Sequence, residues 1–141
     1  MKSIALSDRG DVRVFLTKQF SKWAVDEAID DNTLFDTAEK AFGGEVSADL
    51  GGYLFKQRVA REDGGKSGGY RTILCFRKSN DSRIFFLHGF PKSSKGNITS
   101  KEEKALKKIA KSLVDLSNEQ VEGLKAKMAI RELGNEDGKP Q

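Results

Sequence analysis

The sequence predicts an α+β fold, in which a small antiparallel sheet carries an N-terminal helical hairpin and C-terminal helices. Three observations predict it: two amphipathic helical stretches before residue 44, three strand-like segments between residues 53 and 90, and two helix-capping motifs after residue 99. With 141 residues, the chain has the length of one domain with one hydrophobic core. We therefore expect a single domain over residues 1–141, with its elements in the order β-α-α-β-β-β-α-α.

The N-terminal third predicts a strand followed by a helical hairpin. Residues 1–11 are polar and irregular, whereas residues 12–16 alternate between apolar and other side chains, as an opening strand does. Thr17 can cap a helix that runs to about residue 29. Residues 30–33 can cap a second helix, which the two glycines at 43–44 end. Each helix has one apolar face, so the hairpin needs a sheet to cover.

The middle of the chain predicts three antiparallel strands in succession. In the first, residues 53–60, Lys56 and Arg58 share the face opposite to Phe55 and Val59. The third, residues 83–90, is largely apolar. In the second, residues 70–77, alternation places Tyr70, Thr72, Leu74 and Phe76 on one face and Arg71, Ile73, Cys75 and Arg77 on the other.

The last third predicts two helices. Residues 100–103 (Ser-Lys-Glu-Glu) form a capping box before a helix whose buried stripe contains Leu106, Ile109, Ala110 and Leu113. A second box at residues 117–120 predicts an additional C-terminal helix over residues 117–133. Residues 135–141 are expected to be a disordered tail.

Composition excludes several classes of protein. One Cys excludes a disulfide framework, and one Cys with one His offers no zinc-ligand spacing, so we expect no metal and no cofactor. The sequence has no apolar run of the roughly 18 residues that a membrane span needs. We expect a reduced, cytoplasmic protein without membrane contact.

The positive charge is concentrated in the middle of the chain. Residues 50–100 contain ten basic and three acidic residues, a net charge of +7, against −4 for residues 1–49 and +1 for residues 101–141. Such an excess is typical of a protein with a polyanionic partner, because Lys and Arg that contact phosphates release counterions. A basic surface that serves solubility explains the charge equally well.

Several motifs predict no chemistry. The Gly-Lys-Ser at 65–67 lacks the preceding Gly of a Walker loop, because residue 60 is Ala, and a strand follows it instead of a helix. A flexible glycine-rich hairpin loop is the simpler interpretation. Cys75 lies in the middle of a strand and is expected to be buried and inert. Adjacent carboxylates such as Asp30 and Asp31 lie at caps and turns.

Basic residues gather on the predicted strands and the loops between them. If the strand faces coincide, these cations line one surface of the sheet, where Tyr70 and Phe90 can stack on bases. A solvated sheet face is the alternative. His88 is a candidate general acid or base, or else a structural polar residue near a strand end. The basic residues are Lys56, Arg58, Arg61, Lys66, Arg71, Arg77, Lys92 and Lys95.

Three segments carry a family resemblance. They are the basic strand at 50–61, the segment 65–72 with Gly-Tyr-Arg, and the segment 86–92 with Gly-Phe-x-Lys. In this order they resemble the RelE/ParE superfamily of bacterial toxins, in its RelE/HigB-like branch of type II toxin–antitoxin modules. The resemblance covers residues 12–114, and the N-terminal arm and the last helix lie outside it.

The resemblance implies a ribosome-dependent endoribonuclease that cuts mRNA and inhibits translation, together with a cognate antitoxin that often carries a helix-turn-helix. It implies that Lys56, Arg58, Arg71 and Lys92 surround the scissile phosphate. Attack by the 2′-OH needs a base, an acid and cations for the pentavalent transition state, and Lys and Arg can supply these cations without a metal. Relatives often place a Tyr, His or carboxylate late in the chain for proton transfer. Residues 93–97 contain no Tyr or carboxylate, which leaves His88 and Tyr70.

We expect helices on one face of the sheet and a basic catalytic cleft on the other. Two other functions fit the sequence. A ParE-like toxin inhibits DNA gyrase and cleaves no RNA, and an RNA-binding module binds without cutting. The basic pair of Lys56 and Arg58 with the late Lys92 favours the nuclease, since a gyrase inhibitor does not need cations around a phosphate.

Overall fold

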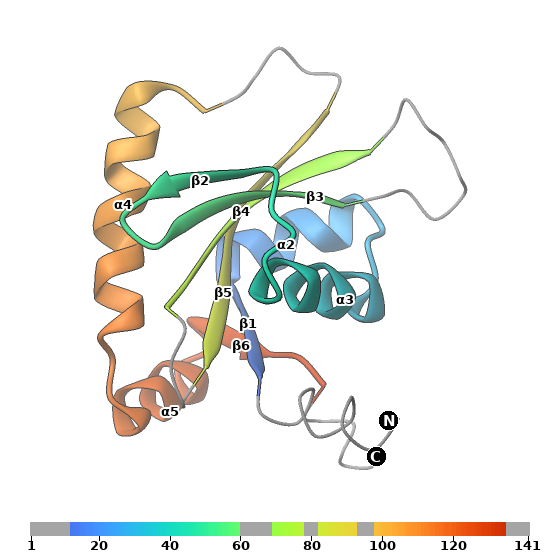
Figure 1. The fold of residues 1–141 in the computed structure, drawn as a ribbon. Coiled ribbons are helices and arrows are strands. Elements are labelled where there is room, and N and C mark those ends of the chain that lie inside the picture. The colour runs from blue at the N-terminus through green and yellow to red at the C-terminus, as the bar shows by residue number, and fades with distance from the viewer. Residues whose placement is uncertain (1–11, 60–68, 78–81, 93–97, 135–141) are drawn as a thin grey trace.

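The computed structural model describes residues 12–59, 69–77, 82–92 and 98–134. The predicted arm and C-terminal tail lie outside these residues, as does nearly all of the glycine-rich loop. In the described ranges, no helix has the length and apolar character needed to cross a membrane. The elements are β1 (Arg13–Thr17), α2 (Lys18–Asp26), α3 (Asp31–Phe42), β2 (Ala48–Gly51), β3 (Leu54–Val59), β4 (Tyr70–Phe76), β5 (Arg83–Pro91), α4 (Ser100–Val114), α5 (Asn118–Ala126) and β6 (Ile130–Glu132) (Figure 1).

One open sheet joins all the strands in the order β2-β3-β4-β5-β1-β6, which confirms the α+β class. The predicted meander of β3, β4 and β5 is antiparallel. β1 lies beside β5 and is parallel to it, with Phe15 opposite Phe85. The opening strand therefore extends the meander, and β6 pairs with its outer side.

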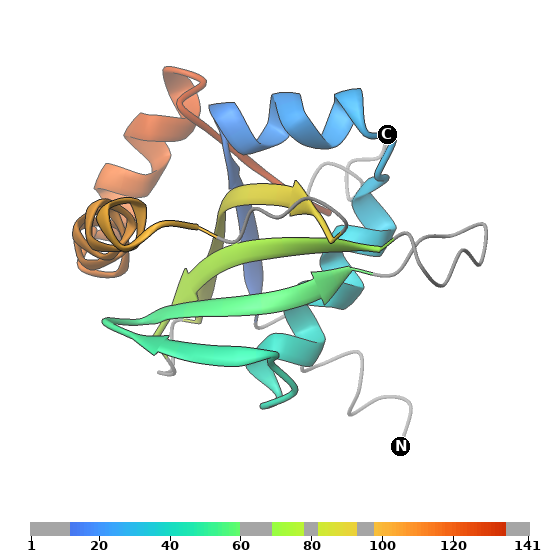
Figure 2. The ribbon, with the colours of Figure 1, turned by 90° about the horizontal axis from the view of Figure 1, so that it is seen from above.

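Helices cover both faces of the sheet, so the prediction of one covered face and one open basic face was wrong. α2 and α3 pack on one face, and α4 and α5 pack on the other (Figure 2). The reason lies in β4 and β5, which are apolar on both faces: Leu74 and Ile73 on neighbouring positions are both fully buried. A sheet of this kind cannot leave one whole face in water.

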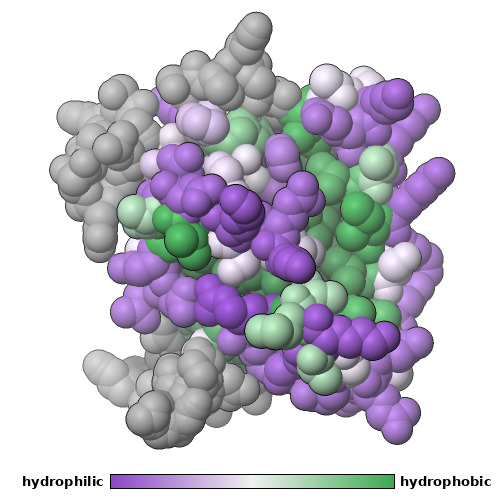
Figure 3. Space-filling view, turned by 180° about the vertical axis from the view of Figure 1, so that it is seen from behind, coloured by the Kyte–Doolittle hydropathy of each residue, from purple (hydrophilic) through white to green (hydrophobic). Residues whose placement is uncertain are grey.

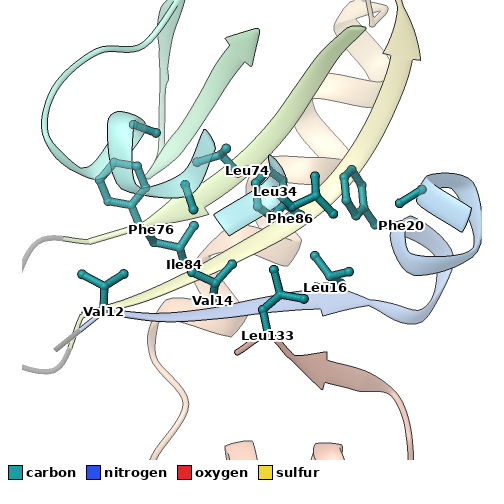
Figure 4. Packing of buried hydrophobic residues seen from close by; sticks show 13 residues of the cluster. Val12, Val14, Leu16, Phe20, Leu34, Leu74, Phe76, Ile84, Phe86 and Leu133 are labelled. Carbon is teal, nitrogen blue, oxygen red and sulfur yellow. The ribbon is translucent and has the colours of Figure 1, made fainter. Parts of the chain in front are cut away.

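The first core lies between the sheet and the hairpin of α2 and α3 (Figure 4). Leu74 and Phe86 from the sheet meet Phe20 from α2 and Leu34 from α3, and all are at most 1% exposed. The rings of Phe20 and Phe86 stack with centroids 5.0 Å apart. Burial of one such side chain stabilises the fold by about 2 kcal/mol, so this core is what holds α2 on the sheet.

The second core lies under α4 and α5 and contains Phe15, Ile73, Phe85, Ala110 and Val121. Ile109, which the sequence placed in the buried stripe of α4, is 46% exposed, so part of that prediction was wrong. Seen from behind, apolar side chains remain visible between hydrophilic ones (Figure 3).

Both predicted N-terminal helices form, with one boundary shifted. Thr17 caps α2 and Asp30 caps α3, as expected. α2 ends at Asp26 and not near residue 29, because Ala28 adopts a left-handed conformation with φ of 57°. The N–H of Ile29 then donates to the carbonyl of Ala24, which closes the helix. Gly usually occupies such a position, so the sequence carries no stop signal there.

The C-terminal elements differ from the prediction in two ways. The capping box of α4 begins at Thr99 and pairs it with Glu102, one residue earlier than expected. The last helix, capped by Ser117 as predicted, ends at Ala126 instead of near residue 133. Residues 130–132 form β6, because Ile130 pairs with Thr17 of β1 and is buried. Such a short edge strand exists only through its partner, as does the equally unpredicted β2, which pairs with β3.

Candidate functional site

The strands β3 and β4 bring three predicted basic residues onto one face of the sheet. Arg58 lies directly opposite Arg71, and Lys56 lies opposite Ile73. Ile73 belongs to the second core, so this is the face that α4 and α5 cover further along the strands. Two like charges directly opposite each other destabilise a sheet. A bound anion between Arg58 and Arg71 would offset their repulsion, so the pair indicates a binding site for a negatively charged group.

A β-bulge in β5 adds two more predicted residues to this face. Leu74 pairs with Phe86 but Ile73 pairs with His88, so Leu87 is an extra residue in β5. Beyond the bulge, Phe90 lies opposite Arg71, and the rings of His88 and Phe90 are 5.9 Å apart. Strict alternation from Phe86 would have turned both rings toward α2. Bulges re-aim side chains in this way beside functional sites.

Arg71 is the least satisfied residue of the group. Its Nη1 atom is buried and has no hydrogen-bond partner among the described residues. Leaving a charged donor buried and unpaired costs more than the roughly 1–3 kcal/mol of a neutral group. A bound anion is the group that would satisfy it, since a guanidinium binds carboxylate or phosphate through parallel hydrogen bonds.

Lys92 lies at the rim of this face. The backbone N–H of Lys92 donates to the carbonyl of Gly69 at 3.0 Å. Since Gly69 is two residues before Arg71, Lys92 lies close to the start of β4. The Nε atom of Arg58 lies 3.9 Å from the point that a Cβ at Gly69 would occupy. Arg58 and Lys92 are exposed, whereas Lys56 is half-buried. We call the set of Lys56, Arg58, Arg71, His88, Phe90 and Lys92 the basic site.

Tyr70 does not belong to the basic site, contrary to the prediction that it stacks on RNA. It precedes Arg71 in β4, so its side chain lies on the opposite face of the sheet. There its hydroxyl donates to Oε1 of Glu27 at 3.0 Å, and its ring meets Trp23 edge-on with centroids 5.4 Å apart. Tyr70 supports the sheet from behind.

Arg77 shares the face of Arg71 but lies at the other end of β4, six residues or about 20 Å away. Its Nη1 is 3.1 Å from Oδ1 of Asp115, and its Nη2 donates to the carbonyl of Val114 at 2.9 Å. Hydrogen bonds from Lys111 and then Arg77 lower the pKa of the Asp115 carboxyl. Arg77 therefore anchors the end of α4 and lies apart from the other basic residues on this face, and its predicted contact with RNA stays a prediction.

Three further predicted residues, Arg61, Lys66 and Lys95, lie outside the described residues, so their positions stay predictions. Cys75 is fully buried, as expected. Burial raises the pKa of its thiol to about 12, which leaves no thiolate at neutral pH.

The bulge is the feature of the site that the sequence analysis missed. Gly89 is the signal that could have revealed it, because an isolated Gly within a strand often marks a bulge or a close backbone approach. With the bulge in place, the basic site has cations for a phosphate, an imidazole that can transfer a proton and a ring that can stack on a base. This combination suits the chemistry of an RNA phosphodiester.

Comparison with known families identifies the family of the chain. A family model described as the RelE toxin of the RelE/RelB toxin–antitoxin system matches residues 12–133. A search of curated protein sequences finds no match. The family match covers every strand of the sheet from β1 to β6 and extends beyond residue 114, where the resemblance drawn from the sequence ends. The chain therefore belongs to the RelE family, the toxins of RelE/RelB toxin–antitoxin systems.

Proposed function

We propose that this toxin is a ribosome-dependent mRNA endoribonuclease of the RelE/HigB-like branch and that the basic site is its active site. The single observation that carries the proposal is the buried, unpaired Nη1 of Arg71 directly across the strand from Arg58. Like charges directly opposite each other destabilise a sheet, so positive charge that served only solubility would not be placed in this way. The protein keeps this destabilising arrangement where β3, β4 and β5 bring basic and aromatic side chains together.

The proposed reaction is a transfer within the RNA chain. The 2′-oxygen attacks the adjacent phosphorus and gives up its proton, the P–O5′ bond breaks, and O5′ takes up a proton. The products are a 2′,3′-cyclic phosphate and a 5′-hydroxyl. Arg58 and Arg71 stabilise the charge of the pentavalent transition state, because their fixed donors need no reorganisation. His88 and Lys56 carry the two protons, and Lys92 holds the flanking phosphate.

The ribosome and the antitoxin complete the proposal. Phe90 stacks on a base next to the scissile phosphate, which requires the mRNA to be held open, as it is during decoding. The family implies an antitoxin partner. We propose that it carries a helix-turn-helix and that the toxin acts in the cytoplasm, where its ribosomal target lies.

Mapping of mRNA 5′ ends after brief expression tests this function, with Arg71→Ala as the control. New ends within translated codons that depend on ribosomes and disappear in the variant are the expected result. Intact mRNA during growth arrest, together with loss of DNA supercoiling, would show a gyrase inhibitor instead. RNA binding in gel shifts without any cleavage on translating ribosomes would show a binding module.

A further inference from the structure

We propose that Trp23 is a positioning residue for the basic site. Its indole, packed on Gly89, holds the bulge of β5 that turns His88 and Phe90 toward Arg71. The inference rests on the proposed function in so far as it concerns catalysis. Trp23 belongs to α2 and lies on the opposite face of the sheet, so it acts only through the backbone between them.

The contact between Trp23 and Gly89 is close enough to require glycine. A Cβ atom at Gly89 would lie 2.3 Å from Cζ3 of Trp23 and 2.6 Å from both Cε3 and Cη2. The six-membered part of the indole therefore lies directly against the backbone of β5. Gly89 pairs with Thr72, whose side chain is on the same face as Trp23. No other residue type at this position leaves the ring where it is.

Gly89 stands between the two rings that the bulge re-aims. With Gly89 facing α2, its neighbours His88 and Phe90 must face the basic site, because side chains alternate along a strand. If the bulge were absent, Gly89 would turn toward the basic site and both rings would turn away. The indole fills the space into which these rings would turn, so it favours the observed register.

The ring of Trp23 is itself held in place from several sides. It contacts Phe20 of the first core with centroids 5.4 Å apart and meets Tyr70 edge-on at the same distance. Tyr70 in turn donates to Glu27, which follows the end of α2. Tyr70 directly precedes Arg71, so the same aromatic cluster supports both β4 and β5 behind the basic site.

The chain has one Trp and one His, so the NMR signals of the Trp23 indole and of the His88 imidazole have no counterparts that overlap with them. We would record the NMR signals of the His88 imidazole in the wild type, in Trp23→Leu and in Phe42→Leu. Phe42 is the matched control, because its ring packs in the same core at the other end of β4, 5.6 Å from Phe76. We expect the His88 signals to shift in Trp23→Leu and to stay unchanged in Phe42→Leu.

Cleavage kinetics on programmed ribosomes give the second readout. Trp23→Leu is expected to lower kcat about tenfold or more, since small misplacement of catalytic groups is costly, and to change KM less than twofold. Gly89→Ala is expected to have a comparable effect in the wild type but little further effect in Trp23→Leu, where the added methyl group meets no ring. Trp23→Phe, which keeps an aromatic ring, is expected to retain most of the activity.

The two proposals fail in different ways. Unchanged His88 signals in a folded Trp23→Leu variant, or additive effects of Gly89→Ala and Trp23→Leu, would overturn the positioning role. A wild-type protein that cleaves no mRNA would overturn the proposed function, and the His88 signals would then decide the positioning role alone. If Trp23→Leu does not fold, Gly89→Ala and Trp23→Phe provide the same comparison.

Discussion

The two ends of β4 carry the same residue on the same face and use it differently. Arg77 at one end bonds to Asp115 and to the carbonyl of Val114, so the C-terminus of α4 satisfies its guanidinium. Arg71 at the other end keeps a buried Nη1 with no partner in the described chain. The elements packed over each end of the strand, and not the strand pattern, therefore decide whether an arginine is structural or available for a ligand.

Two other arginines of the described sheet are paired as Arg77 is. Arg13 pairs with Glu132 at 2.8 Å, and Arg131 pairs with Asp31 at 3.1 Å. Arg58 and Arg71 face each other instead. Proteins retain such destabilising arrangements where function requires them.

The exchange of each arginine for alanine tests the comparison most directly and has the largest expected effect. Arg71→Ala should lower the rate of RNA cleavage by at least about 100-fold, because it removes a donor to the transition state. It should leave Tm unchanged or higher, because it also removes an unpaired buried charge. Arg77→Ala should do the reverse: keep cleavage close to the wild-type rate and lower Tm. An equal loss of cleavage in both variants would mean that RNA cleavage depends on the total positive charge of the protein and not on the position of Arg71.

The next largest effect is expected for the other cations of the basic site. Lys56→Ala and Arg58→Ala should each slow cleavage about tenfold, because each removes part of the charge around the phosphate. Lys108 is the matched control, since it is an exposed lysine on α4 outside the basic site. Cleavage rates of the three variants on programmed ribosomes provide the measurement. Equal losses in all three would contradict a localised site.

A smaller effect, on stability and not on cleavage, is expected when the partner of the paired residue Arg13 is changed. The carboxylate of Glu132 is 6% exposed and accepts from Arg13 and from Lys125, the latter at 2.7 Å. Glu132→Gln should therefore lower the free energy of unfolding by about 2 kcal/mol, the typical value of hydrogen bonds to a charged group. Urea unfolding measures it. Cleavage by the folded variant should equal that of the wild type, and a loss of activity would link β6 to the site.

The smallest expected effect is on how Tm depends on acidic pH, through the ion pair between Arg77 and Asp115 at the end of β4. Hydrogen bonds from Lys111 and Arg77 lower the pKa of Asp115 from its usual 3.8. The folded protein keeps this charge where the unfolded chain begins to lose it, so the stabilisation is complete above pH 3.8 and disappears as pH falls through the folded-state pKa. Asp115→Asn should flatten the decline of Tm with acid, whereas Arg71→Ala should leave it unchanged.

Local patterns in the sequence determined much of this protein. The side-chain pattern of residues 70–77 and the apolar run within 83–90 are enough to define β4 and β5. The side chains of Thr17, Asp30 and Ser117 cap helices because they can satisfy free backbone N–H groups nearby. The same alternation predicted that Lys56 and Arg58 share one face of the first strand, and Arg71 and Arg77 one face of the second. Whether the two faces coincide depends on strand register, and the pairing of Arg58 with Arg71 shows that they do. These features depend on neighbours a few residues away.

The remaining features cannot be deduced from local patterns, because they depend on contacts between segments far apart in the chain. β6 forms because β1 offers it a free edge, more than 110 residues earlier in the sequence. The direction of His88 depends on a bulge whose Gly89 lies against Trp23 of α2. The different roles of Arg71 and Arg77 depend on where the C-terminus of α4 lies over β4. The alternation of side chains along a strand shows which residues share a face, but it contains no information about which elements pack over each end of the strand.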